Sequence, residues 1–295
     1  MTRQPGSRPR VVVVGDLGLD VLSRATDRVV PGHDTRAATT IVPGGAGANT
    51  AAWLARCGAE VTLIARIGDD HAGRTAAAGL AAAGVDCRLT VDPELPTCCI
   101  VVVVEPDGER TMLSDRGANA RLDPADLDLS GLPGGSHLHL SGYPLLDASS
   151  RAAGLAALAA ARAAGWTTSV DPQSATHLAG VGPSAFLDWI GGVDLLLPNE
   201  SELEMLGGVA GALQAVGAVA CTHGSRGASW HTAGESVTVP AIPVRQPDST
   251  GAGDAFNAGV LAAWLSGAAP RDALLAGVRA GSAAAAQLGA WPAPL

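Results

Sequence analysis

Short apolar runs alternate with helical runs from about residue 136 onward, and this alternation constrains the fold more than any other feature of the chain. Strands that alternate with helices form parallel sheets, because each crossover helix returns the chain to start the next strand in the same direction. The β-branched run 11–14 predicts a buried central strand. The sequence therefore predicts an α/β fold, with further strands at 60–67, 137–140, 167–170, 193–197, 219–222 and 237–239.

A polar glycine loop, residues 248–254, runs directly into an apolar helical stretch, 255–265. Amides at a helix start lack intrahelical partners and lie at the positive end of the helix dipole. They favour an anion, above all a phosphoryl group, on the amides of Gly251, Ala252 and Gly253. Asp254 would repel that anion at rest, so we interpret it as a general base that takes the proton of an attacking hydroxyl. The alternative is a helix cap with a glycine turn.

Two further polar clusters follow predicted strands. Asp16 and Asp20 come after 11–14, at the strand end where open α/β sheets bind ligands, and a carboxylate suits a vicinal diol. In the second cluster Gly44 and Gly45 allow close backbone approach, and Asn49 offers a donor and an acceptor. The alternatives are a solvated turn for Asp20 and a plain strand-to-helix turn for the glycines. Asp171 ends its own strand and is a lesser candidate for the same cleft.

Composition excludes several classes of protein. A net charge of −9 argues against general affinity for nucleic acid, and the absence of lysine excludes a Walker-type phosphate loop. We expect a cytoplasmic protein with no membrane partner, because the chain shows neither a membrane-length apolar stretch nor a signal peptide. Five cysteines without a Cys-x-x-Cys pattern indicate reduced thiols. His137 and His139 are expected on one strand face, with a metal site as the alternative.

A small second sheet is predicted from a hairpin. The runs 97–105 and 110–115 flank Pro106-Asp107-Gly108, a hairpin signal, and β-prone pieces precede Pro43. The chain is thus one domain, 1–295, with insertions at about 21–42 and 97–116. Beyond the hairpin, Asn119 is a candidate for touching the substrate. Arg116 either neutralises phosphate charge or forms an ion pair.

Four motifs occur in one order: Gly-Gly-Ala-Gly-Ala-Asn at 44–49, Asn-Glu-Ser-Glu at 199–202, Thr-His-Gly-Ser-Arg-Gly at 222–227 and Asp-Ser-Thr-Gly-Ala-Gly-Asp at 248–254. In these motifs, and from Gly15 to Trp291, the chain resembles the ribokinase-like (PfkB) carbohydrate kinases. The resemblance implies a doubly wound, mostly parallel central sheet with helices on both faces. It also implies that the small β-sheet is a lid that closes over a sugar and excludes water.

The resemblance further implies ATP-dependent phosphorylation of a sugar hydroxyl, with Asp254 as base and the glycine-loop amides as anion hole. Asn199 and Glu202 would organise Mg²⁺ through water, although they fit a helix cap equally well. The resemblance implies that the sugar is bound by Asp20, Gly44, Gly45 and Asn49, and position alone makes Asp16 and Asn119 further candidates. It implies that the nucleotide is bound by Thr222, Gly224 and Gly227. It also implies that K⁺ is bound by Asp248 and Thr250.

The substrate stays open between several alternatives. Ala46 stands where many family members carry Lys or another polar residue, which argues against ribose. An apolar residue there, with Trp53 nearby, leaves room for a nucleoside such as pseudouridine. The family also contains fructose and deoxygluconate kinases. A non-catalytic sugar- or nucleotide-sensing protein is the alternative of another class, and the intact Asp254 loop argues against it. A homodimer through the lid is known in the family and is left open here.

Overall fold

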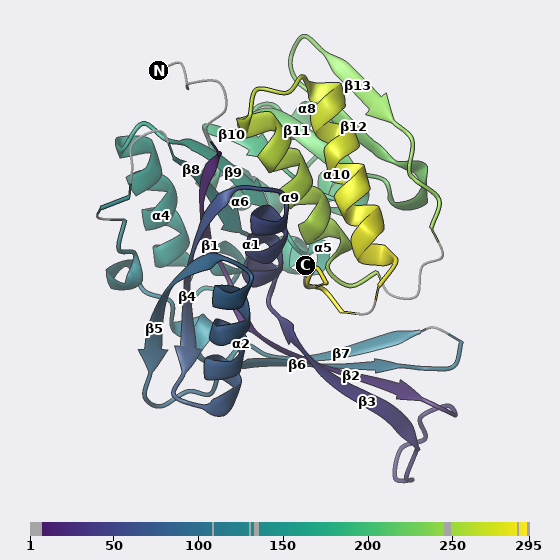
Figure 1. Ribbon diagram of the computed structural model, residues 1–295. Helices are drawn as coiled ribbons and strands as arrows, with labels where there is room; N and C mark the ends of the chain where they lie inside the picture. Colours follow the sequence, from purple (N-terminus) through teal and green to yellow (C-terminus); the bar gives the residue numbers. More distant parts are fainter. Residues whose placement is uncertain are drawn as a thin grey trace.

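The computed structural model describes residues 8–107, 109–129, 131–132, 136–244, 249–287 and 289–293. Within these ranges one nine-stranded sheet has the order β13-β12-β11-β10-β9-β8-β1-β4-β5 (Figure 1). Its neighbours from β11 to β5 pair in parallel, and the β11–β12 and β12–β13 pairs are antiparallel. The strands are β1 Arg10–Val14, β4 Glu60–Gly68, β5 Val85–Asp92, β8 His137–Ser141, β9 Thr167–Asp171, β10 Val193–Leu196, β11 Val216–Thr222, β12 Ala228–His231 and β13 Ser236–Val239.

The sheet is doubly wound about its first strand, as predicted. Residues 11–14 of β1 are at most 2% exposed, so this strand lies in the middle of the core. The chain builds β4 and β5 on one side of β1 and then returns to build β8 on the other. The order therefore reverses between β1 and β8. In open α/β sheets this reversal is where the carboxyl ends of the strands form a ligand crevice.

Helices cover both faces because side chains alternate along each strand. Val11 and Val13 pack on the face with α1, α2, α9 and α10, and Val12 and Val14 on the opposite face. Among the described residues no helix is long and apolar enough to cross a membrane. The helices are α1 Ala46–Arg56, α2 His71–Ala82, α3 Tyr143–Leu146, α4 Arg151–Ala163, α5 Ala175–Val181, α6 Pro183–Trp189, α7 Glu200–Met205, α8 Gly208–Ala212, α9 Ala252–Leu265 and α10 Pro270–Ala285, with 3-10 turns at Gly117–Arg121, Pro124–Asp126 and Gly224–Arg226.

A separate four-stranded sheet projects from the main body (Figure 1). Its order is β3-β2-β6-β7, and the hairpin predicted at 97–115 forms its β6 and β7. The first strand begins at Gly18, a few residues before the predicted start of the insertion, so Asp20 lies on the small sheet itself. The strands are β2 Gly18–Ala25, β3 Ala37–Gly44, β6 Cys98–Val104 and β7 Arg110–Asp115.

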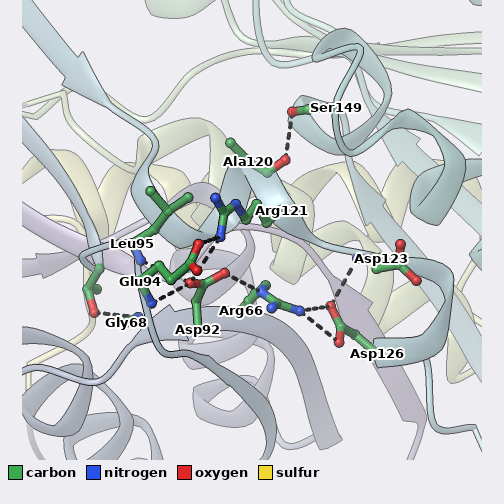
Figure 2. A network of polar contacts seen from close by, with 11 residues as sticks. Arg66, Gly68, Asp92, Glu94, Leu95, Ala120, Arg121, Asp123, Asp126 and Ser149 are labelled. Carbon is green, nitrogen blue, oxygen red and sulfur yellow. Dashed lines mark hydrogen bonds and ion pairs between the residues drawn. The ribbon is translucent and has the colours of Figure 1, made fainter.

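A polar network fastens the small sheet where the chain enters β6 and leaves β7 (Figure 2). Asp92 at the end of β5 is fully buried and accepts bonds from the backbone amides of Glu94 and Leu95, both at 2.9 Å. Arg66 of β4 joins Asp92 at 3.1 Å to Asp126 at 3.0 Å. Arg121, just past β7, reaches Asp92 at 3.5 Å and Glu94 at 2.7 Å. The segment that enters β6 and the segment that leaves β7 are therefore both bonded to the end of the main sheet.

Candidate active site

Helix α9 begins at the predicted glycine loop. Gly251 is its N-cap residue with φ +73°, and a Cβ there would lie 2.6 Å from the Cβ of Ala290, so the position requires glycine. The Ala252 amide donates to the Ser249 carbonyl at 3.2 Å. The amide of Gly253 belongs to the first turn and has no intrahelical acceptor. The helix thus presents donors and its positive end to the space before it.

That space is a cavity of about 130 Å³ at the carboxyl ends of β9, β10 and β11. It joins Asp254 and both glycines of the loop to residues contributed by three strand ends. Its lining consists of Asp171, Gln173, Leu197, Asn199, Glu202, Thr222, Gly251, Gly253, Asp254 and Asn257. The structure therefore brings together most of the residues predicted on the phosphate side of the site.

Asp254 also contacts the first glycine cluster. Asn49 Nδ2 donates to Asp254 Oδ2 at 2.8 Å, across 205 positions of sequence. Burial raises the pKa of Asp254 to about 6, and the amides of Asn49 and Gln173 act in the opposite direction. The carboxylate is thus ionised at neutral pH and is a stronger base than an exposed aspartate.

Three carboxylates share the small cavity. Burial raises the pKa of Asp171, and the negative charges of Glu202 and Asp254 raise it further. Burial also raises the pKa of Glu202. Asp171 is held by Asn257 Nδ2 at 2.6 Å. Crowding these carboxyls together disfavours their charged forms, and a bound cation would relieve that repulsion as a proton does.

Asn199 and Glu202 start helix α7 as a reciprocal capping box. Asn199 Nδ2 donates to Glu202 Oε1 at 2.7 Å, and the two backbone amides bond the partner side chains at 2.9 and 3.0 Å. The capping alternative is therefore correct for this pair. It does not remove the pair from the cavity, which both side chains line. Because both Glu202 oxygens already accept hydrogen bonds, contact with a metal through water fits better than direct ligation.

The first glycine cluster surrounds the carboxylate of Asp20. Asp20 and Asn49 are each 5% exposed. A Cβ on Gly44 would collide with the Asp20 carboxylate, and one on Gly45, at φ +93°, would lie 2.6 Å from the Asp16 carbonyl. Gly45 caps helix α1, whose first turn carries Asn49. The glycines therefore bring a strand of the small sheet and a helix of the main body together at two polar side chains.

Asp16, Asn119 and Arg116 are occupied by protein contacts. Arg116 Nη2 pairs with Asp16 at 2.8 Å and its Nη1 with Asp147 at 2.9 Å, so the ion-pair alternative is correct. Asn119 Nδ2 donates to the Leu17 carbonyl at 3.0 Å, and its Oδ1 accepts from the Leu17 amide at 3.4 Å. Asn119 is 2% exposed, so we interpret it as holding the backbone near Asp20. The contact with the substrate that the sequence predicts for Asn119 stays a prediction.

A larger cavity of about 490 Å³ meets the small one at Thr222 and Gly253. The predicted residues Thr222, Gly224 and Gly227 lie on its wall. Sequence reasoning assigned no residues of the tail, yet α10 supplies much of the opposite wall. The apolar lining includes Ile242, Val244, Phe256, Val278 and Ala285. The size and lining suit an aromatic base.

Other predicted residues lie elsewhere. Asp248 is outside the described residues, and Thr250 lies in the turn before α9. Trp53 is 6% exposed and donates its Nε1 to the Ala290 carbonyl at 2.8 Å, so it packs in the core and does not offer its ring to a ligand. His137 and His139 both bond Ser169 Oγ, at 2.7 and 2.8 Å. Among the described residues no cluster of ligating side chains could hold a metal directly.

Two curated relatives cover most of the chain. An ATP-dependent ribose-1-phosphate kinase from Halopiger xanaduensis is 32% identical and aligns over 97% of this chain and 95% of its own. A fructokinase from Klebsiella pneumoniae is 31% identical over 86% and 83% of the two chains.

The fold agrees with a solved structure from Escherichia coli that was determined in complex with ATP and Mg²⁺. It superimposes with a TM-score of 0.86 at 25% identity and covers 96% of this chain and 94% of that one. The profile of the pfkB family carbohydrate kinases matches residues 8–294, nearly the whole chain. The chain therefore belongs to the pfkB family of carbohydrate kinases.

Proposed function

We propose that this kinase transfers the γ-phosphoryl group of ATP to a hydroxyl, primary in the simplest case, of a sugar or of the sugar moiety of a nucleoside. The observation that carries the proposal is the 2.8 Å bond between Asn49 and Asp254. It places the predicted base beside a predicted sugar-binding side chain, although the two lie 205 positions apart in sequence. The kinase relatives described above support the same chemistry.

On the acceptor side, Asp20 and Asn49 would bind sugar hydroxyls. The Oδ1 atom of Asn49 is buried and has no hydrogen-bond donor among the described residues, so it is available to accept from a substrate hydroxyl. Asp254 takes the proton of the attacking hydroxyl. Its pKa of about 6 leaves it ionised at neutral pH and basic enough to accept a proton as the bond to phosphorus forms.

On the phosphoryl side, the first-turn amides of α9 stabilise charge on the transferred group, an effect that is often the largest in catalysis. The larger cavity holds the base and ribose of ATP. The oxygen-rich lining fits a magnesium ion bound through water, because Glu202 and Asn199 line the cavity together with the carboxyl groups of Asp171 and Asp254. When bound, Mg²⁺ neutralises phosphate charge. We further propose that the small sheet is a lid that excludes water.

The test is an ADP-release assay over a panel of acceptors: ribose 1-phosphate, fructose, 2-dehydro-3-deoxygluconate, ribose, adenosine and pseudouridine. We expect turnover with at least one of them, and loss of that turnover in Asp254→Asn. A protein that binds a panel member but turns over none would instead be the sugar- or nucleotide-sensing alternative. Trp53 is buried and so adds no support for a nucleoside, and that alternative then depends on the apolar residue at Ala46.

Activation by K⁺ through Asp248 and Thr250 remains a proposal, and the same assay with K⁺ replaced by Na⁺ tests it. We also keep the prediction that the protein works in the cytoplasm.

A homodimer through the small sheet is supported by an apolar row across its four strands. Ile41, Val21, Val101 and Leu113 are register partners in turn, and Ile41 and Leu113 are 64% and 62% exposed. A second copy would cover this row. Light scattering should give a dimer mass for the natural chain and a monomer mass for Leu113→Arg.

A further inference from the structure

Gln173 adopts a backbone conformation that glutamine rarely takes. Its φ is +69°, and it is the one residue other than glycine with positive φ within the described ranges. The Ser174 amide donates to the Pro172 carbonyl at 2.9 Å, which closes a γ-turn around Gln173. A γ-turn with positive φ is strained, and such strain concentrates at functional sites. Glycine would form this turn with less strain. The presence of a glutamine side chain at this position therefore requires an explanation.

Contacts from three elements hold the turn in place. The Gln173 amide donates to Asp171 Oδ1 at 2.8 Å, and Asn257 of α9 binds Asp171 Oδ2 at 2.6 Å. Gly142 packs so closely on this segment that a Cβ there would lie 2.7 Å from the Pro172 carbonyl. The fold therefore fixes the backbone of Gln173 and with it the direction in which the Cα–Cβ bond points.

The side chain lines the cavity that also contains Gly253 and Asp254. Its Nε2 atom is buried and has no acceptor within hydrogen-bonding distance among the described residues. It is nevertheless near enough to Asp254 to lower the pKa of that carboxyl. A buried amide without an acceptor costs free energy, so native structures rarely keep one unless a ligand or water completes it.

We propose that Gln173 Nε2 donates a hydrogen bond to an oxygen of the phosphoryl group during transfer and is thus a catalytic residue of this kinase. The inference rests on the proposed function, because it assigns the cavity to that group. Gln173 would add a side-chain donor from the end of β9 to the backbone donors of α9.

A neutral donor suits this position better than a charged one. None of the described residues that line the cavity is an arginine or a lysine. A cation next to Asp254 would favour its charged form and weaken it as a base. An amide stabilises developing charge on phosphate oxygens at a smaller cost to that base.

The experiment compares the natural chain with Gln173→Gly and Gln173→Glu. Glycine suits the positive φ and removes the donor. Glutamate keeps the shape but replaces Nε2 with an oxygen. Gln214→Gly, at an exposed glutamine outside the cavity, is the matched control. Calorimetry measures the affinity for ADP with Mg²⁺, with and without aluminium fluoride as a phosphoryl mimic, in the presence of the best acceptor of the panel. Turnover is measured in parallel.

We expect aluminium fluoride to tighten ADP binding by the natural chain and by Gln214→Gly. Gln173→Gly should bind ADP alone as the natural chain does, whereas the added negative charge of Gln173→Glu should also weaken the binding of ADP alone. In both variants aluminium fluoride should tighten ADP binding at least tenfold less than in the natural chain, and kcat should fall about 10²-fold or more. Full tightening in Gln173→Gly would overturn the inference while leaving the proposed function intact. No tightening and no turnover in the natural chain would overturn both.

Discussion

Replacing Asn49 with alanine tests how the pKa of Asp254, the proposed general base, is set. The hydrogen bond from Asn49 Nδ2 to Asp254 Oδ2, at 2.8 Å, stabilises the charged carboxylate and so lowers its pKa, whereas burial raises it. The balance of these effects gives a pKa of about 6. A hydrogen bond to a charged group contributes about 1.5–3 kcal/mol, and 1.36 kcal/mol corresponds to one pKa unit. Because Asp254 is only half-buried, water replaces part of the bond. We therefore expect the pKa to rise by about one unit.

The assay is the pH dependence of kcat/KM for the acceptor, which reports the ionisation of the free enzyme. A rise of about one unit lowers the ionised fraction at pH ~6.5 roughly threefold, and hardly changes it at pH ~8.5. Loss of the proposed contact between Asn49 and the acceptor would lower kcat/KM by the same factor at every pH. The acid limb of the pH profile, where kcat/KM falls as pH drops, therefore reports the change in the pKa of Asp254 separately from the loss of binding.

Asp20→Asn is the matched control. It weakens a proposed sugar contact without removing a partner of Asp254, so kcat/KM should fall while the acid limb stays in place. An acid limb in Asn49→Ala that coincides with that of the natural chain would refute the tuning of Asp254 by Asn49.

Three further predictions follow from the same geometry. Asp254→Asn should lose about 10²–10⁴-fold in kcat and keep its affinity for ADP by calorimetry, and a near-normal kcat would remove the general-base role. Gly251→Ala should lower the free energy of unfolding in urea by about 1–2 kcal/mol, because alanine is strained at φ +73° and its Cβ meets Ala290; an unchanged urea midpoint would contradict this. His139 is buried and its pKa is lowered to about 3, so the unfolded chain binds more protons than the native one below pH ~6.5. Its contribution to stability should then fall by up to about 1.4 kcal/mol per pH unit as pH drops, and His139→Asn should show a flatter decline between pH ~7 and pH ~5, measured by urea unfolding.

The main sheet could be predicted from sequence because its central strands are short apolar runs with clear borders. Two strands of the main sheet were not predicted. Strand β5 is an edge strand whose alternating polar residues give little apolar signal, and β12 has four residues. The hairpin of β6 and β7 was predicted because its turn is marked locally by proline and glycine.

Motifs in the sequence predicted which polar side chains should lie near one another. Asn49 contacts Asp254, and Asp254 and Glu202 line the same cavity at the carboxyl ends of the strands. These contacts join residues far apart in sequence, so the spacing within each motif could not predict them. Gln173 was missed because its relevant properties are a positive φ and a buried amide, and neither leaves a mark in composition or periodicity. The burial of Trp53 could not be predicted, because its proximity in sequence to Ala46 does not indicate that Ala290 of the tail contacts it.

The placement of Asp20 on β2 divides the acceptor site between two bodies. One carboxylate belongs to the small sheet and the other, Asp254, to a helix of the main body. If the acceptor binds as proposed, it bridges these two bodies, and its size affects how closely they can approach. Selectivity for acceptor size would then depend on the segments that join the small sheet to the main sheet beside Asp92, where Glu94 and Leu95 are bonded, as well as on the side chains that contact the acceptor.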